Sequence, residues 1–381
     1  MKILHVTSSI SPEGGGVATA VAGITSTLVD KSVECTVFST VGARVGTNPY
    51  RLEGVETHLF QTSQLDRFWR GHSFKLKSSL GQIISSYDLI HIHELWTYPG
   101  LAAYQVAKST NKPYVVTPHG FLDPKRLSHK SFKKRPYMKL IERNILNQAS
   151  TLFALTITEK EHIRNLGISS PISVIPNGVF PEMFNTLPLQ AGVLNKLSQV
   201  KGKYIILYMG RIHPLKGIDL LVEAFGEITS VRDDVCLVIA GEDEVGYRSH
   251  VELKLSNLGV LDQTIFTGLL NETDKIAILG TADIFVLPSY SEGFSMALLE
   301  AMASSLPVII TDKCYFPEVR TSDAGFIIKT ESNQLRDALM NFLENPEKIK
   351  QMGKRGRELV SQKYTWDKVV DQIKLIYQNV I

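Results

Sequence analysis

Residues 284–310 read IFVLPSYSEGFSMALLEAMASSLPVII, and the order of patterns within this stretch decides the fold. An apolar run at 284–287 has the length of a buried strand, and a proline- and serine-containing break follows it. From about Ser295 the apolar residues recur with helical spacing, and a second apolar strand comes at 307–310. A strand, a helix and a strand in this order predict two parallel strands covered by a helix.

The same alternation extends over most of the chain. A first strand at residues 2–7 is followed by a glycine-rich turn, Gly14-Gly15-Gly16, and by an apolar-periodic helix at 17–28. Further strands are expected at residues 34–38, 89–93, 114–117, 152–155, 204–209, 235–239 and 264–266. Strands alternating with helices predict α/β architecture, with parallel sheets covered on both faces.

The pattern breaks once, near the middle of the chain. It loosens at Pro176-Asn177-Gly178 and resumes only at residue 204, which places a linker region at 181–203. We therefore expect two Rossmann-like domains, 1–180 and 204–363, with ligands bound in a cleft at the carboxyl ends of their strands. Residues 364–381 are expected to form a last helix with one apolar face.

Composition excludes several classes of protein. The 381 residues contain 41 Lys and Arg against 38 Asp and Glu, a net charge of +3, with 44% hydrophobic residues. These values exclude a disordered chain and give no support to general nucleic-acid binding. Cys35, Cys236 and Cys314 lack the spacing of a disulfide framework or a thiolate zinc site. Neither a signal peptide nor a transmembrane run is expected, so the expected location is the cytoplasm.

Two cations stand on one strand-to-helix loop. Arg211 and Lys216 follow the expected strand at 204–209 and precede an apolar-periodic helix. A guanidinium grips phosphate oxygens as a fork and an ammonium acts as a compact charge, so the pair is suited to a diphosphate. An ordinary solvated basic loop is the alternative reading of this stretch by itself.

The quoted stretch at 284–310 also carries two carboxylates. Glu292 precedes the expected helix and Glu300 lies about one and a half turns into it. Unpaired N–H groups at the helix start attract anions, and the carboxylates are placed to accept hydrogen bonds from sugar hydroxyls. The alternative is structural, with Glu292 as a partner of the helix dipole and Glu300 as a surface residue.

Together these motifs resemble the retaining nucleotide-sugar glycosyltransferases of family 4, which have the GT-B fold. The resemblance rests on the Glu292-x7-Glu300 signature, on Gly210-Arg211-x4-Lys216-Gly217 upstream of it, and on their order along the chain. Further matches are Gly14-Gly15-Gly16, Thr117-Pro118-His119-Gly120, Val174-Ile175-Pro176-Asn177-Gly178-Val179 and Tyr364-Thr365-Trp366. The family's fold implies an N-terminal acceptor-binding domain, a C-terminal donor-binding domain and a last helix that crosses back to the first domain.

The resemblance also implies roles for single residues. His119, Arg211, Lys216 and Glu292 would be the catalytic residues: the two cations bind the donor diphosphate, and Glu292 and His119 contact the transferred sugar. Glu300 would hold the ribose. The remaining donor-binding positions implied are Gly15, Gly16, Gly293, Phe294, Ser295 and Met296. Ser295 departs from the glycine common in the family, and its hydroxyl is suited to capping the helix.

His91 and His93 raise the alternative of a metal site. Both lie on one face of an expected strand, because side chains alternate along a strand. No third ligand has an obvious spacing, and the family is generally metal-independent, so no metal and no cofactor are expected. His213, beside Pro214, is expected to be structural or at the rim of the site.

A basic tract in the first half of the chain suggests a partner. Between Pro124 and Asn144 there are eight cations and one acid, Glu142, with interleaved apolar residues. The cations are Lys125, Arg126, Lys130, Lys133, Lys134, Arg135, Lys139 and Arg143. Such a surface is suited to anionic lipid headgroups or a pyrophosphate-linked acceptor, and residues 67–77 would extend it. A solvated helix is the alternative.

The resemblance implies a hexosyltransferase that retains the anomeric configuration, and UDP-glucose is the first donor expected, with other UDP-hexoses and GDP-mannose next. The acceptor would be a saccharide or lipid-linked saccharide in envelope or exopolysaccharide biosynthesis, at the inner face of the plasma membrane. A nucleotide-sugar epimerase of GT-B shape and a non-catalytic sugar-nucleotide-binding protein remain as alternatives.

Overall fold

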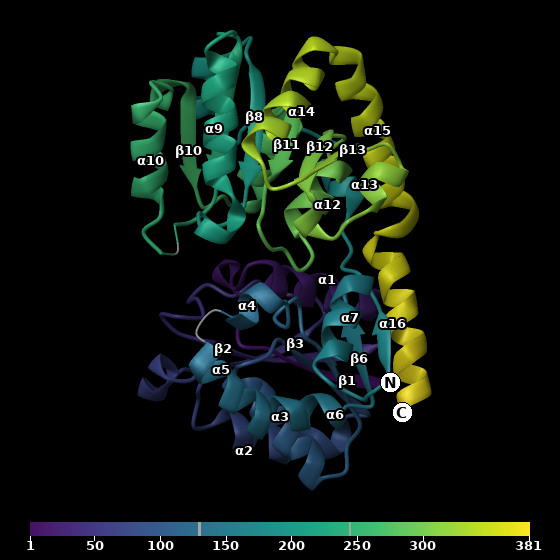
Figure 1. Cartoon of the computed structure of the whole chain (residues 1–381). Helices are drawn as coiled ribbons and strands as arrows, with labels where there is room; N and C mark the ends of the chain where they lie inside the picture. The colour runs from purple at the N-terminus through teal and green to yellow at the C-terminus, as the bar shows by residue number, and fades with distance from the viewer. Residues whose placement is uncertain (129–130, 244) are drawn as a thin grey trace. The chain divides into compact units, whose positions relative to one another are not determined.

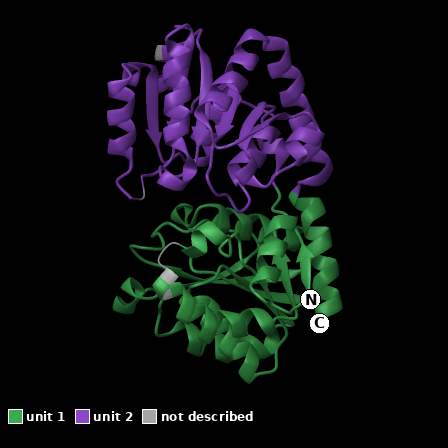
Figure 2. Cartoon of the chain, viewed as in Figure 1, with its two compact units in different colours: residues 1–178, 366–381 green, residues 179–365 purple. Residues whose placement is uncertain are grey.

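The chain folds into two compact units. The computed structural model describes residues 1–128, 131–243 and 245–381. Unit 1 consists of Met1–Gly178 and Trp366–Ile381, and unit 2 of Val179–Thr365 (Figure 2). The stretch expected as a linker, 181–203, lies in unit 2, where it forms three short helical segments. These are η5 (Pro181–Phe184), α8 (Val193–Leu197) and η6 (Ser198–Val200).

Unit 1 is built on a seven-stranded parallel sheet with the order β3-β2-β1-β4-β5-β6-β7. Strands β1, β2, β3 and β6 of this sheet are labelled in Figure 1. The strands are β1 (Lys2–Val6), β2 (Glu34–Val41), β3 (Glu56–Gln61), β4 (Leu89–His93), β5 (Tyr114–Thr117), β6 (Thr151–Ala154) and β7 (Ile172–Val174). The order reverses between β1 and β4, which is where doubly wound sheets bind ligands at the carboxyl ends of their strands.

Unit 2 repeats this topology with six parallel strands in the order β10-β9-β8-β11-β12-β13. They are β8 (Tyr204–Met209), β9 (Val235–Ala240), β10 (Thr264–Gly268), β11 (Ile284–Leu287), β12 (Val308–Thr311) and β13 (Gly325–Ile328). The central strands are apolar along their whole length because helices cover both faces. The expectation of two Rossmann-like domains is confirmed.

The helices connect successive strands. In unit 1 they are α1 (Gly16–Asp30), α2 (Leu76–Ile83), α3 (Tyr98–Ser109), α4 (Pro124–Ser128), α5 (Ser131–Tyr137), α6 (Arg143–Asn147), α7 (Ile157–Asn165) and the terminal α16 (Trp366–Val380), with a turn of π-helix, η4, at Met138–Glu142. In unit 2 they are α9 (Ile218–Thr229), α10 (Arg248–Asn257), α11 (Glu272–Thr281), α12 (Met296–Ala303), α13 (Glu318–Thr321), α14 (Ser332–Glu344) and α15 (Pro346–Lys363), in addition to α8.

The terminal helix α16 belongs to unit 1, although the chain reaches it from unit 2. Trp366 at its start is buried against α1, where a Cβ atom on Gly23 would lie 2.2 Å from Cε2 of the indole. The Nζ atom of Lys31, at the end of α1, lies 2.7 Å from Oδ1 of Asp371. Glycine at position 23 therefore lets the two helices approach closely.

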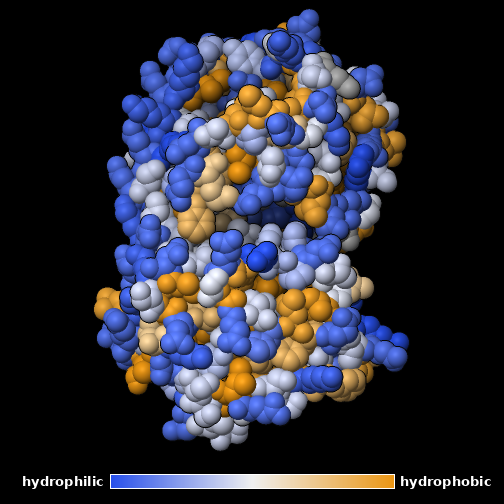
Figure 3. Space-filling view, turned by 180° about the vertical axis from the view of Figure 1, so that it is seen from behind, coloured by the Kyte–Doolittle hydropathy of each residue, from blue (hydrophilic) through white to orange (hydrophobic). Residues whose placement is uncertain are grey.

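The surface carries no single dominant apolar area on the face drawn in Figure 3, where apolar and polar side chains are interspersed. Among the described residues, every helix is too short or too polar to cross a bilayer.

Candidate functional site

The loop after β8 contains the two cations expected to bind phosphate. A turn of 3-10 helix, η7 (Pro214–Lys216), is capped by His213, whose Nδ1 accepts a hydrogen bond from the N–H of Leu215 at 3.1 Å. Gly217 follows with φ of 65°, and a Cβ atom there would lie 2.0 Å from the carbonyl oxygen of Pro288. Glycine is therefore needed for this loop to pack against the loop after β11.

Those two loops bring Lys216 and Glu292 together. Nζ of Lys216 lies 2.5 Å from Oε2 of Glu292, and the side chains are 12% and 8% exposed. The backbone supports this arrangement, since the N–H of Tyr290 donates to the carbonyl oxygen of Leu215 at 2.9 Å. A cation and a carboxylate 76 positions apart in sequence thus form one largely buried pair.

Arg211 lies at the start of the same loop. Its carbonyl oxygen accepts a hydrogen bond of 2.8 Å from the hydroxyl of Tyr208, which is fully buried in β8. Burial raises the pKa of that tyrosine well above its ordinary value, so the hydroxyl stays protonated and remains a donor. The backbone of Arg211 is therefore held in place, while the residue itself is exposed.

The start of α12 presents backbone donors, as expected. Ser295 is the N-cap residue, and its hydroxyl accepts from the N–H of Leu298 at 3.2 Å. The expectation that this serine caps the helix is confirmed. In the part of the chain that the structure describes, no acceptor is bonded to the N–H groups of Phe294, Ser295 and Met296. These groups and the helix dipole form a site suited to an anion.

Glu300 lies one turn further along α12 and is also paired. Nζ of Lys275, in α11, lies 2.5 Å from Oε1 of Glu300, whose side chain is 8% exposed. Sequence reasoning missed Lys275, because nothing in the local pattern of α11 marks it. Both carboxylates of the Glu-x7-Glu motif therefore have a lysine partner in this structure, which argues against a plain surface role for Glu300.

Gly15 and Gly16 lie at the start of α1, where the loop after β1 ends. Gly15 is the N-cap residue with φ of 60°, and among the described atoms none lies within 4 Å of where its Cβ would be. The positive φ explains the preference for glycine at position 15. Both residues are exposed, so the backbone is open to a ligand at this point.

His119 follows β5 and has a strained backbone. Its φ is 54°, a value that residues other than glycine adopt rarely, and Gly120 beside it has φ of 74°. The turn is held by Glu159, which accepts from the N–H of Gly120 at 2.6 Å and from that of Leu155 at 2.7 Å. His119 is 7% exposed, so the fold holds this side chain firmly at the end of the strand.

Sequence reasoning also missed the role of Glu94. This residue follows β4 with φ of 70°, and Oε1 of its buried carboxylate accepts from Thr7 Oγ1 at 2.7 Å and from Ser8 N at 2.9 Å. It therefore ties the loop after β1 to the end of β4 at the point where the strand order reverses. Its position directly after the expected strand 89–93 was the available signal.

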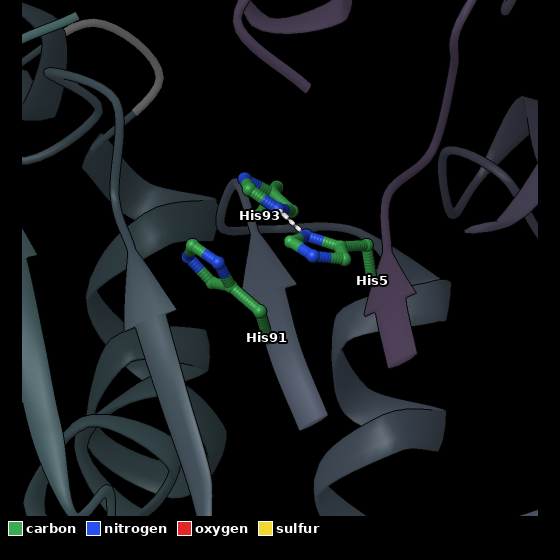
Figure 4. A group of neighbouring side chains, drawn as sticks. All are labelled: His5, His91 and His93. Carbon is green, nitrogen blue, oxygen red and sulfur yellow. Dashed lines mark hydrogen bonds between the residues drawn. The ribbon is translucent and has the colours of Figure 1, made fainter. Parts of the chain in front are cut away.

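Three buried histidines form a cluster within unit 1. His5 lies opposite His91 in the register of β1 and β4, and His93 follows two residues later on the same face (Figure 4). One nitrogen of each ring lies within 4.8 Å of the others, so these residues are the candidate ligand set for a metal. His91 is engaged on both sides, by Tyr377 Oη at 2.5 Å and Thr117 Oγ1 at 2.7 Å. The absence of a metal from the reaction stays a prediction.

The basic tract covers α4, α5 and η4 of unit 1. Lys130 lies outside the described residues. Phe132 and Leu140 are 73% and 69% exposed, which places apolar side chains among exposed cations such as Arg135 and Lys139. Glu142, the one acid of the tract, is buried: Oε1 accepts from the N–H of Trp96 at 2.6 Å, and burial raises its pKa to about 7.

Two Rossmann-like units with these loops at the carboxyl ends of their strands define the GT-B class of protein. The model described as "Glycosyltransferase Family 4" matches residues 14–182, and the model "Glycosyl transferases group 1" matches residues 194–359. The chain therefore belongs to the family 4 glycosyltransferases.

Curated relatives agree with this family. The chain is 31% identical over 211 residues to the phosphatidyl-myo-inositol mannosyltransferase of Mycobacterium leprae, a match that covers 54% of this chain and 53% of the relative. It is 24% identical to the D-inositol 3-phosphate glycosyltransferase of Segniliparus rotundus, over 84% of this chain and 71% of the relative. The first match spans about half the length of the curated relative.

Solved structures share the fold over the whole chain. The sucrose-phosphate synthase of Thermosynechococcus elongatus superposes with a TM-score of 0.82 at 20% identity, covering 100% of this chain and 99% of the other. Anabaena HepE in complex with UDP-glucose superposes with a TM-score of 0.81 at 19% identity, covering 100% of both chains. At these identities the similarity establishes the GT-B fold.

Proposed function

We propose that the protein transfers a hexosyl group from a nucleotide-diphosphate sugar to a saccharide or lipid-linked saccharide acceptor, with retention of configuration. The observation that carries the proposal is the pair formed by Lys216 and Glu292 at 2.5 Å. A cation suited to the leaving diphosphate and a carboxylate suited to a sugar hydroxyl stand side by side, at the carboxyl ends of β8 and β11.

The chemistry asked of these residues is charge stabilisation. As the bond to the sugar breaks, negative charge grows on the diphosphate, and Arg211, Lys216 and the N–H groups at the start of α12 are the donors that would stabilise it. Glu300 would accept from the ribose and Glu292 from the transferred sugar. His119 of unit 1 is assigned to the donor sugar by the family resemblance. Neither carboxylate is assigned as a covalent nucleophile, and these donors would act without a metal.

The donor is proposed to be UDP-glucose. HepE was solved with that compound, whereas a relative in Mycobacterium tuberculosis is named as GDP-mannose-dependent. Incubation with a panel of UDP- and GDP-sugars and assay of released nucleotide tests the proposal: one preferred donor with slow hydrolysis supports it. Release from none of them, with and without saccharide acceptors, would contradict it.

The same assay separates the rival functions. An epimerase would convert one nucleotide sugar into another without releasing nucleotide, and a binding protein would retain the sugar nucleotide unchanged. A non-catalytic protein is expected to keep Glu300 and the fold while losing the phosphate grip, so the presence of Arg211 and Lys216 together with both carboxylates favours the transferase.

We also propose that the basic tract meets anionic lipid during envelope polysaccharide synthesis at the inner face of the plasma membrane. Exposed Phe132 and Leu140 among the cations support this, since apolar side chains insert at a headgroup boundary while cations attract anionic lipid. Liposome flotation tests it. Binding to phosphatidylglycerol vesicles at physiological salt should be lost in Arg135→Gln/Lys139→Gln and kept in the control Lys350→Gln/Lys354→Gln on α15. Absence of binding by the unaltered protein would remove the membrane proposal.

A further inference from the structure

A lysine and a glutamate on consecutive helices form a second largely buried pair in unit 2. Nζ of Lys275, in α11, lies 2.5 Å from Oε1 of Glu300, in α12, and the side chains are 24% and 8% exposed. The family resemblance assigns a ligand to Glu300 and no role to Lys275. The pair therefore joins a cation without an assigned role to a carboxylate of the candidate site.

The two carboxylate oxygens of Glu300 have different surroundings. Oε1 accepts from Lys275, whereas Oε2 has no hydrogen-bond partner among the described residues. The buried atoms without a partner include Oε2 of Glu142 but not Oε2 of Glu300, so the latter keeps some exposed surface. Oε1 can also accept a second hydrogen bond, because a carboxylate oxygen has two lone pairs. Lys275 thus fixes one end of the carboxylate and leaves the other end open to the hydroxyl groups of a ligand.

The start of α11 holds Lys275 in place. Asn271 is the N-cap residue, and its Oδ1 accepts from the N–H of Asp274 at 2.8 Å. The carboxylate of Asp274 in turn accepts from the N–H of Val193 at 2.9 Å. A cation near the start of a helix gains nothing from the helix dipole, which favours anions there. The ammonium group of Lys275 is therefore stabilised by Glu300 rather than by its own helix.

Glu300 needs this partner to remain a charged acceptor with a fixed orientation. A carboxylate that is 8% exposed has lost most of its hydration, and burial without a cation disfavours the charged form. Without Lys275 the side chain of Glu300 would take up a proton or turn towards water. Either change would weaken its hydrogen bonds to a ligand, because bonds to a charged acceptor are about twice as strong as neutral ones.

We propose that Lys275 is a positioning residue that holds Glu300 charged and oriented for the ribose hydroxyls of the donor, and so sets a preference for ribonucleotides over deoxyribonucleotides. The assignment of the ribose to Glu300 rests on the proposed function, whereas the pairing of the two side chains rests on the geometry of unit 2 alone. In this role Lys275 does not touch the reacting atoms and acts only through Glu300.

Calorimetric titration of the full chain with UDP and with 2′-deoxy-UDP tests this role. GDP and 2′-deoxy-GDP replace them if the protein binds guanine nucleotides instead. A hydrogen bond to a charged group contributes about 10-fold to 100-fold in affinity, so the unaltered protein should prefer UDP by this factor. Lys275→Met should remove most of the preference, mainly by weakening the binding of UDP. Lys275→Arg keeps a cation beside Glu300 and should retain the preference.

Further variants separate positioning from a purely structural role. A lysine that only stabilised unit 2 would, on removal, weaken UDP and 2′-deoxy-UDP equally. The control Lys254→Met removes the lysine of an exposed pair with the same 2.5 Å distance and should leave the preference unchanged. In Glu300→Gln the preference should already be lost, so adding Lys275→Met should change it no further. Thermal unfolding confirms that each variant is folded, and Lys275→Gln is measured if Lys275→Met is not.

Turnover of the nucleotide sugar gives an independent readout. The ribose is held equally in the ground state and the transition state, so Lys275→Met should raise KM by about 10-fold to 100-fold with kcat little changed. An unchanged preference for UDP in Lys275→Met would overturn the proposal. So would a larger preference, which would show that the lysine competes with the ribose, and so would an unaltered protein that binds neither UDP nor GDP. If no nucleotide sugar is turned over, the proposed function fails while the calorimetric result stands.

Discussion

Lys216 and Glu292 form an ion pair with Nζ and Oε2 2.5 Å apart, and both side chains are nearly buried. Buried pairs of this kind contribute little net stability, because desolvation offsets their attraction. Removing only one partner should lower the free energy of unfolding, because it leaves an uncompensated charge in the interior. The pair therefore couples the stability of unit 2 to the loop after β8, which is proposed to bind the donor phosphates, and the effects on stability and on activity can be separated by mutation.

Lys216→Met should lower both activity and stability. Loss of one donor to the leaving diphosphate should reduce kcat for the nucleotide sugar by about 100-fold to 1,000-fold. Unpaired Glu292 should lower the free energy of unfolding by about 3 kcal/mol or more. The double variant Lys216→Met/Glu292→Gln should recover most of the stability and none of the activity. Urea unfolding and steady-state kinetics measure both.

The control for this prediction is Lys254→Met. Lys254 pairs with Glu223 at the same 2.5 Å distance, but these side chains are 27% and 42% exposed. Exposed pairs contribute about 1 kcal/mol or less, so stability and turnover should change little. If the double variant stays as unstable as Lys216→Met, the buried charge is not the cause of the instability.

Ser295 should contribute to stability as a helix cap independently of catalysis. Its hydroxyl accepts from the N–H of Leu298, and replacing a serine cap by alanine costs about 1 kcal/mol. Ser295→Gly should cost only a few tenths of a kcal/mol. Calorimetry should find the same affinity for UDP in the unaltered protein, in Ser295→Ala and in Ser295→Gly, because each keeps the backbone N–H groups at the start of α12. Equal stability of Ser295→Ala and Ser295→Gly would contradict the capping role.

The sequence pattern predicted the interior strands well and missed three of the four edge strands, the exception being β10. Strands 89–93, 114–117, 204–209 and 284–287 were predicted with the observed bounds, because both faces of each are buried. All except 89–93, where two histidines alternate with apolar residues, read as largely apolar runs. The missed strands β3, β7 and β13 each lie at an edge of a sheet. Glu56–Gln61 mixes polar with apolar residues, and Ile172–Val174 is only three residues long. Edge strands need less apolar surface, so periodicity detects them poorly.

The residues of the candidate site also fall into those that a local sequence pattern predicted and those that it missed. Lys216 and Glu292 were identifiable because each stands in a local motif after an apolar strand. The partners of Lys275, Glu94 and His5 were not predicted, because they lie 25, 87 and 88 positions away in the sequence. In particular, the third histidine of the cluster is brought to His91 by the pairing of β1 with β4. Sheet order, which the local pattern does not contain, is what assembles these residues.

Glu142 should make the protein less stable as the pH rises. Burial raises its pKa to about 7, against an ordinary value of 4.5. Between these values the folded chain binds a proton that the unfolded chain has lost, so the free energy of unfolding falls across this window. Glu142→Gln keeps an acceptor for the N–H of Trp96 and removes the charge. At pH 8 this variant should be more stable by up to about 3 kcal/mol.

Urea unfolding at pH 5 and pH 8 measures this effect, and Glu161→Gln on α7 is the control because Glu161 is exposed. The gain in Glu142→Gln should shrink towards pH 5, where the carboxyl group of the unaltered protein is protonated in the folded state. A gain that is equal at both pH values would show that the titration of Glu142 is not its source.

Four buried histidines should make the protein unstable in acid. Burial lowers the pKa of His5 and His119 to about 3, and that of His91 and His93 well below the ordinary 6.5. Between about 3 and 6.5 the unfolded chain therefore binds protons that the folded chain excludes, so stability is present above pH 6.5 and lost as the pH falls. Four such groups give the free energy of unfolding a slope of up to about 5 kcal/mol per pH unit.

Two variants should change this slope in opposite directions. Glu142 opposes the histidines by one proton between pH 4.5 and 7, so Glu142→Gln should make the free energy of unfolding fall more steeply as the pH falls. His91→Gln should make that fall shallower by about 1.4 kcal/mol per pH unit. Urea unfolding between pH 5.0 and 7.5 measures these slopes, and a free energy of unfolding that is constant over that range would show that the cluster is protonated in the folded protein.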